Sequence, residues 1–215
     1  MGRIFPKSFD KTVRGALALV AALAAGAVGL LAYFAYPTQF KTGYQPVQPV
    51  AYSHKLHAGN LGLDCRYCHT TVDRANFAAV PPTETCMNCH LRVKTQSPLL
   101  TAVRESYATG KSVPWVKVHH LPDFVYFSHQ AHVGAGVSCV SCHGRVDQMV
   151  EVRQVKPLTM AWCLDCHRNP APHVRPAEFV TKLDWQPDRD PAAIGREIIA
   201  AKHIAPPVNC SGCHR

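Results

Sequence analysis

No cysteine of this chain stands outside a single short motif. All ten cysteines occur in five C-x-x-C-H sequences, at residues 65–69, 86–90, 139–143, 163–167 and 210–214. A disulfide framework also uses an even number of cysteines, but it has no need of a histidine after each second one. Zinc ribbons pair two C-x-x-C elements per metal ion, so five elements would leave one without a partner and the histidines unexplained. The lack of other cysteines therefore argues against both alternatives.

Charge is absent from residues 15–36, GALALVAALAAGAVGLLAYFAY. The lack of any strongly polar side chain over these 22 residues excludes the segment from a soluble fold. As a helix rising about 1.5 Å per residue, it is long enough to cross the hydrocarbon core of a bilayer. The apolar part of a cleaved signal peptide is usually shorter, about 7–15 residues, so we expect a retained transmembrane helix.

Basic residues precede this helix. Arg3, Lys7, Lys11 and Arg14 are opposed by a single acid, Asp10. The positive-inside rule places this end in the cytoplasm and the rest of the chain on the periplasmic side of a bacterial plasma membrane. We therefore expect a cytoplasmic N-terminus over 1–14, a single transmembrane helix over 15–36, a polar, proline-bearing linker over 37–50 and a periplasmic domain over 51–215.

Acidic residues are scarce, with 14 Asp and Glu against 23 Lys and Arg, and the formal net charge is +9. The basic residues are not interleaved with aromatic side chains in the way that nucleic-acid surfaces require. The charge balance therefore does not indicate an RNA or DNA partner.

C-x-x-C-H is the attachment motif of c-type haem. Its two thiols form thioether bonds to the porphyrin, and the histidine becomes the proximal ligand of the iron. We therefore predict five covalently bound haems c. Their thioether cysteines are Cys65 and Cys68, Cys86 and Cys89, Cys139 and Cys142, Cys163 and Cys166, and Cys210 and Cys213. Their proximal ligands are His69, His90, His143, His167 and His214.

Haem propionates account for the basic excess, because five haems bring about ten carboxylates and arginine is a usual partner for such groups. Haem c is attached outside the cytoplasm, which agrees with the orientation of the anchor. The arginines near the motifs are Arg66, Arg92, Arg145, Arg153, Arg168 and Arg175.

The remaining histidines reveal an internal repeat. The sequence aromatic-Ser-His-x-x-His occurs at residues 52–57 and again at 127–132, each time ahead of two haem motifs. The copies cover residues 52–90 and 127–167, and the motif at 210–214 stands outside them.

Low-spin haem iron needs a second axial ligand, and eight histidines remain after the five proximal ones. Residues i and i+3 of a helical turn project from one face, so one H-x-x-H pair serves two different haems and holds them close together. The fifth ligand is open: a thioether there would raise the reduction potential of its haem. The predicted distal ligands are His54, His57, His119, His129 and His132, and the alternatives to His119 are Met160, His173 and His203.

Regular structure should be sparse, because seventeen prolines interrupt the chain. We expect helices over 97–110 and 190–203, short helical turns at the motifs and few strands. Since haem faces would supply much of the buried apolar surface, the apoprotein should not fold stably. The predicted fold class is a multihaem cytochrome c with one N-terminal transmembrane helix and a haem-packed, mostly irregular domain with short α-helices and few strands.

The H-x-x-H repeat is similar to that of the small class III multihaem cytochromes. Five motifs on one anchor, with VHHLPDFVYFSHQAHVGAGVSCVSCHG, LTMAWCLDCHRNP and a terminal CSGCHR, resemble the pentahaem cytochrome subunit of alternative complex III over the whole chain. The resemblance implies a membrane complex that oxidises quinol and passes electrons outward. It implies as partners an iron–sulfur subunit related to molybdopterin oxidoreductases, multi-span quinol-binding subunits and a mono-haem cytochrome c.

The function expected from these features is electron transfer without a catalytic site. The chain would serve a respiratory or photosynthetic quinol-oxidising complex and relay electrons through bis-histidine haems to a periplasmic acceptor. The alternative is a stand-alone, membrane-anchored multihaem quinol dehydrogenase that feeds a periplasmic reductase. A nitrite- or hydroxylamine-converting enzyme needs an iron with an open position, and the spare histidines argue against one.

Overall fold

The computed structural model describes residues 6–35 and 41–214. The chain divides into two compact units, residues 1–40 and 41–215. Parts of the expected N-terminus, anchor and linker, namely residues 1–5, Tyr36 and 37–40, lie outside the described residues.

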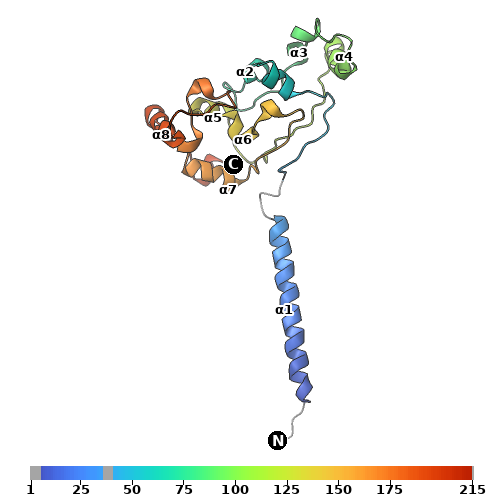
Figure 1. The fold of residues 1–215 in the computed structure, drawn as a ribbon, viewed down its shortest axis with the longest axis vertical. Helices are drawn as coiled ribbons and strands as arrows, with labels where there is room; N and C mark the ends of the chain where they lie inside the picture. Colours follow the sequence, from blue (N-terminus) through green and yellow to red (C-terminus); the bar gives the residue numbers. More distant parts are fainter. Residues whose placement is uncertain (1–5, 36–40, 215) are drawn as a thin grey trace. The chain divides into compact units, whose positions relative to one another are not determined.

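The first unit contains the long helix α1, Lys7–Ala35 (Figure 1). The most apolar 18-residue stretch within Ser8–Ala35 has a mean hydropathy of 2.3, and none of its residues is buried within the structure. By length and composition the helix can cross a membrane, a test that an N-terminal signal sequence also passes. It begins just after Pro6 rather than at residue 15, because the basic residues between them do not break a helix.

The second unit consists of short helices joined by turns. The residues described there form no strand, only isolated antiparallel bridges between Val125 and His214 and between Val137 and Val174. The α-helices are α2 Cys65–Cys68, α3 Thr83–His90, α4 Thr101–Thr109, α5 His129–Ala135, α6 Cys139–His143, α7 Met160–Arg168 and α8 Pro191–Lys202. A π-helix, η2, covers Lys55–Asn60, and single 3₁₀ turns are η3 Pro98–Leu100, η4 Val146–Gln148, η5 Ala171–His173, η6 Ala177–Phe179 and η7 Cys210–Gly212. This arrangement confirms the predicted fold class.

Two helices begin and end at the signals in the sequence. Pro98 opens η3, which leads into α4, and α4 ends at Thr109, directly before Gly110 with φ 70°. Asp190 caps α8 by accepting hydrogen bonds from N–H groups of its first turn, with Pro191 at the first helical position. The left-handed conformation of Gly110 explains why α4 stops there.

The two repeat copies hold each other through equivalent hydrogen bonds. The N–H of Gln130 donates to the carbonyl of Ala75 over 3.1 Å, and the N–H of Lys55 donates to the carbonyl of Met149 over 2.9 Å. Both donors directly follow the first histidine of an H-x-x-H segment. Both acceptors lie six residues after the histidine of the other copy's first haem motif. Each copy therefore supports the H-x-x-H segment of the other.

The H-x-x-H segments differ in helix type. The first histidine precedes the next cysteine by 11 residues in the first copy, from His54 to Cys65, and by 10 in the second, from His129 to Cys139. The first copy forms π-helix η2, in which the N–H of Leu61 donates to the carbonyl of Leu56, whereas the second forms α5. A wider turn accommodates one additional residue, so η2 absorbs the difference in length.

Side chains supply only a small core to the second unit. One cluster joins Val50, Met87 and Val103 with the partly buried Leu100 and Trp115. The other buried apolar residues described are Val72, Met149, Ala171, Val174, Val180 and Ile194. Side-chain packing alone therefore buries little apolar surface for a unit of this length.

Gly195 is a close-packing site between α8 and η5. It is buried, and a Cβ atom added to it would overlap the backbone carbonyl of Ala171. We expect Gly195→Ala to destabilise the unit by about 1–3 kcal/mol, because backbone cannot yield as a flexible side chain does. Thermal unfolding of the haem-loaded protein measures this. The control is Ala200→Ser, on an exposed position of the same helix, and equal melting temperatures for both variants would contradict the expectation.

Candidate functional site

Side-chain caps hold the helical turns of three of the five haem motifs. The Asp64 carboxylate accepts a hydrogen bond from the N–H of Arg66 over 2.9 Å at the start of α2. Thr159 caps α7 and Asn209 caps η7 in the same way. The cap fixes the first cysteine in the first turn, so the second, three residues later, projects from the same face. All five motifs lie on helical turns, as predicted, although α3 and α6 have no side-chain cap.

The cysteine pairs of the five motifs form a continuous series in space. The side chains of Cys65 and Cys139 lie close together, and this contact together with burial raises the pKa of the Cys65 thiol. Burial, with the neighbouring thiols, likewise raises the pKa of Cys142 to about 11. The interacting pairs along the series are Cys86–Cys68, Cys65–Cys139, Cys142–Cys163 and Cys163–Cys213.

This cysteine series therefore runs from 86/89 through 65/68, 139/142 and 163/166 to 210/213. Figure 1 shows the corresponding helices in that order across the second unit, from α3 through α2 and α6 to α7. Cys89 and Cys210, at its two ends, are exposed, whereas the other eight cysteines are partly buried. Chain order alone does not give this arrangement, since the first two motifs exchange places in it.

Three proximal histidines each face a histidine of an H-x-x-H segment. A metal ion bound by one nitrogen of each ring at about 2 Å leaves the ring centroids roughly 6 Å apart. The observed spacings match one iron between each pair. They are 6.3 Å for His57–His90, 6.4 Å for His129–His143 and 6.0 Å for His132–His167.

Backbone carbonyls set the tautomer of these rings. A carbonyl only accepts, so each Nδ1 atom carries the proton and Nε2 keeps the lone pair that binds metal. Nδ1 of His57 donates to the carbonyl of Ser53 over 2.9 Å, and Nδ1 of His132 to that of Ser128 over 2.7 Å. The same bond joins His69 to Ala79, His90 to Val93, His129 to Asn76 and His167 to Pro207. The residues thus fit haem iron.

The aromatic residue of each repeat copy fixes the two imidazoles that follow it. Phe127 stacks on His132 with the ring centroids 4.6 Å apart and meets His129 edge-on at 4.8 Å. Tyr52 makes the same two contacts with the histidines of the first copy, at 4.5 and 4.8 Å. Sequence reasoning assigned these aromatic residues no role, although their recurrence at one position of the repeat was the available signal.

Burial keeps several of these imidazoles neutral. Together with the weaker effect of neighbouring histidines, it lowers the pKa of His54 to about 4 and that of His143 to about 3. Neutral imidazole is the form that binds a metal. His54 occupies the position equivalent to His129 and interacts with His69, the proximal histidine of its own copy. Its Nδ1 atom is buried without a hydrogen-bond partner in the described part of the chain.

The structure does not bring His119 to the C-terminal motif. The His119 ring lies 4.3 Å from that of His143, and its Nε2 atom is buried with no hydrogen-bond partner among residues 6–35 and 41–214. The His214 ring instead lies 5.7 Å from Phe124. A fifth distal ligand at His119 therefore stays a prediction, and its placement favours the central haems.

The alternative ligands occupy three separate elements. Met160 opens α7 with 64% of its surface exposed, one turn before Cys163, which interacts with Cys213. His173 ends η5, and His203 caps the end of α8. Of these three, only Met160 lies on α7, the helix whose haem motif is next to the C-terminal motif in the cysteine series.

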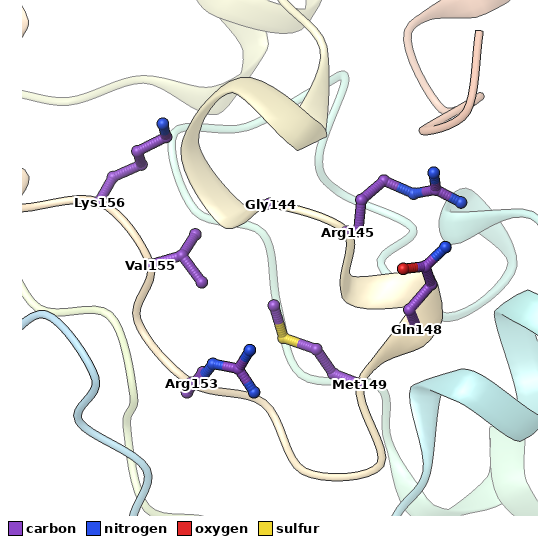
Figure 2. A pocket seen from close by; sticks show the side chains of 7 residues that line it. All are labelled: Gly144, Arg145, Gln148, Met149, Arg153, Val155 and Lys156. Carbon is purple, nitrogen blue, oxygen red and sulfur yellow. The ribbon is translucent and has the colours of Figure 1, made fainter.

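A cavity of about 400 Å³ opens directly after the third motif (Figure 2). Arg145 at its edge is paired with Asp147 at 2.6 Å, whereas Arg153 and Lys156 form no ion pair with any described residue. Lys156 interacts electrostatically with Cys142. Cations beside an attachment cysteine suit the carboxylates of haem propionates. The lining residues are Gly144, Arg145, Gln148, Met149, Arg153, Val155 and Lys156.

This chain is similar to known proteins over part of its length. Residues 125–215 match the family described as cytochrome c7 and related cytochrome c. The chain is also 36% identical over 112 residues to the multihaem cytochrome c subunit of a menaquinone reductase from Nitratidesulfovibrio vulgaris. That alignment covers 52% of this chain and 51% of the relative, so the chain spans about half the length of the curated relative it matches.

These similarities agree with the geometry of the motifs. Over residues 125–215 the chain contains a multihaem cytochrome c domain, a family that implies covalently bound haem c. The matched region includes the second repeat copy and the last motif.

Proposed function

We propose that this chain is the membrane-anchored electron-transfer subunit of a quinol-oxidising respiratory or photosynthetic complex, with five haems c on the periplasmic side. The observation that supports this best is the set of three histidine pairs with centroids 6.0–6.4 Å apart. Two imidazoles on one iron leave no position for a substrate. The chain then has no catalytic site of its own and acts as a conductor.

The polypeptide sets the path of the electrons. When bound, haem supplies iron that alternates between the ferric and ferrous states. The cysteine series holds the five attachment sites in the order 86/89, 65/68, 139/142, 163/166 and 210/213. Its centre is the contact between Cys65 and Cys139, where the two repeat copies meet. The exposed ends at Cys89 and Cys210 are the points of exchange with partners.

The partners follow from resemblance and similarity. Five motifs on one anchor resemble the cytochrome subunit of alternative complex III, whose neighbours are an iron–sulfur subunit, multi-span quinol-binding subunits and a mono-haem cytochrome c. The relative's name, a menaquinone reductase subunit, favours a second candidate in which electrons pass from the haems to quinone. Both functions use the same series of haems, and the partner complex determines the direction of electron transfer.

Spectroscopy of the purified full-length chain, with any subunits that accompany it, tests this function. We expect five haems per chain by haem assay and low-spin electron paramagnetic resonance signals from all of them. Cyanide and carbon monoxide should leave the spectra unchanged, because both axial positions are filled. A ligand-binding high-spin fraction in the untreated protein would refute the conductor. Reduction of the isolated chain by a menaquinol analogue would favour a stand-alone quinol dehydrogenase.

A further inference from the structure

We propose that the surface around residues 91–94 docks an acidic electron-transfer protein at the α3 end of the cysteine series. This surface, termed the 91–94 surface, consists of Leu91, Arg92, Val93 and Lys94 with the neighbouring Leu99. The proposal rests on the proposed function in one respect, that the haem at Cys86 and Cys89 carries electrons.

The 91–94 surface is held directly against a haem motif. Nδ1 of His90, the proximal histidine, donates to the carbonyl of Val93 over 3.0 Å. The guanidinium of Arg104 on α4 donates to the carbonyls of Thr95 over 3.1 Å and Ser97 over 2.8 Å. These bonds pin the turn between α3 and α4. A partner seated on it therefore lies next to the end of the series, where Cys89 is exposed.

Apolar side chains of this surface point to solvent. Leu91, Val93 and Leu99 are 53%, 54% and 65% exposed. These exposed side chains provide a small apolar contact area for a partner protein beside the turn. Transient electron-transfer complexes use interfaces at the small end of the range, because the partner must leave after each exchange.

The cations around this surface form no ion pair with any described residue. Residues 83–117 contain five basic residues against two acidic ones, a net charge of +3. All the ion pairs formed by the described residues lie elsewhere in the chain. Arg104 is engaged by the turn, and the other four cations are exposed. They are Arg92, Lys94, Lys111 and Lys117.

The other end of the unit contrasts with this one. On α8 and the turn before it, Arg189 pairs with Glu197 and Arg196 with Asp190. Unpaired cations beside an electron-transfer site attract an acidic partner and raise its rate of association, by about 10- to 1,000-fold in steered complexes. Charge complementarity thus selects an acidic protein for the 91–94 surface.

The test uses the full, haem-loaded chain, reduced and mixed with oxidised plastocyanin, an acidic blue-copper protein, in a stopped-flow instrument. One electron passes from ferrous haem iron to Cu(II), which gives ferric iron and Cu(I). We expect R92E/K94E to lower the second-order rate at least tenfold at low ionic strength. The rates of the variant and the parent should converge in high salt, because the attraction is screened.

A matched control makes the same change of charge on α8. R189E/R196E should leave the rate with plastocyanin within twofold of the parent. With a basic mono-haem cytochrome c as the oxidant, R92E/K94E should raise the rate, because repulsion becomes attraction.

Two outcomes would overturn the proposal. One is an unchanged rate with plastocyanin in R92E/K94E. The other is a loss of rate with both oxidants together with an altered haem spectrum or midpoint potential, which would make Arg92 and Lys94 propionate partners. High-spin spectra of the parent chain would instead refute the proposed function, so the two failures are distinguishable.

Discussion

His132→Gly is expected to convert one haem per chain from low spin to high spin and to create a carbon monoxide site where the parent has none. His132 faces His167 with the ring centroids 6.0 Å apart. Its Nδ1 atom is held by the carbonyl of Ser128, and Phe127 stacks on its ring. These contacts hold the imidazole in place opposite His167, so its removal leaves that axial position open. Electron paramagnetic resonance and carbon monoxide titration of the haem-loaded protein measure the change.

Added imidazole should restore the low-spin signal of this variant, because the glycine leaves space for a free ligand in the same position. His57→Gly should behave alike but affect the haem at Cys86 and Cys89, so the double variant should show two high-spin haems. The matched control is His120→Gly, at an exposed position. Five low-spin haems in His132→Gly would show that another residue ligates that iron.

Local patterns in the sequence account for much of the site. The i, i+3 spacing predicted that one H-x-x-H segment serves two haems, and the structure places His129 against His143 and His132 against His167. Ligation of iron by these rings stays a prediction. The helix signals at Pro98 and Asp190 likewise predicted α4 and α8 closely. Such features depend on residues a few positions apart, which a single sequence displays.

Contacts between distant residues could not be predicted in this way. The bond between Gln130 and Ala75 and its counterpart between Lys55 and Met149 join the two copies across the sequence. They depend on how whole modules pack rather than on local preference. The spatial order of the motifs follows from that packing, since it brings Cys65 to Cys139. The π-helix η2 was accessible in principle, because the first copy is one residue longer between histidine and cysteine.

Without haem, the 41–215 unit is expected to lose its folded structure. The buried apolar side chains described in it are few, and a domain is stable by only about 5–15 kcal/mol even with a full core. A group that binds only the folded chain contributes its binding free energy to folding. Hydrogen exchange and limited proteolysis should therefore show an unprotected unit when the chain is made without haem attachment, whereas α1, inserted in a membrane, should stay protected.

Removal of a single haem motif should cause a loss of protection that depends on the position of the motif in the cysteine series. C139S/C142S removes the attachment site at the contact between the two copies, where Cys139 meets Cys65, so we expect exchange to rise in both copies. C210S/C213S removes the terminal site outside the repeats, where Cys210 is exposed, so protection elsewhere should stay close to that of the parent. Native-like protection in the haem-free chain would mean that side chains alone hold the fold. Equal losses of protection in the two variants would contradict the expectation. They would mean that the site between the two copies contributes no more to the fold than the terminal site does.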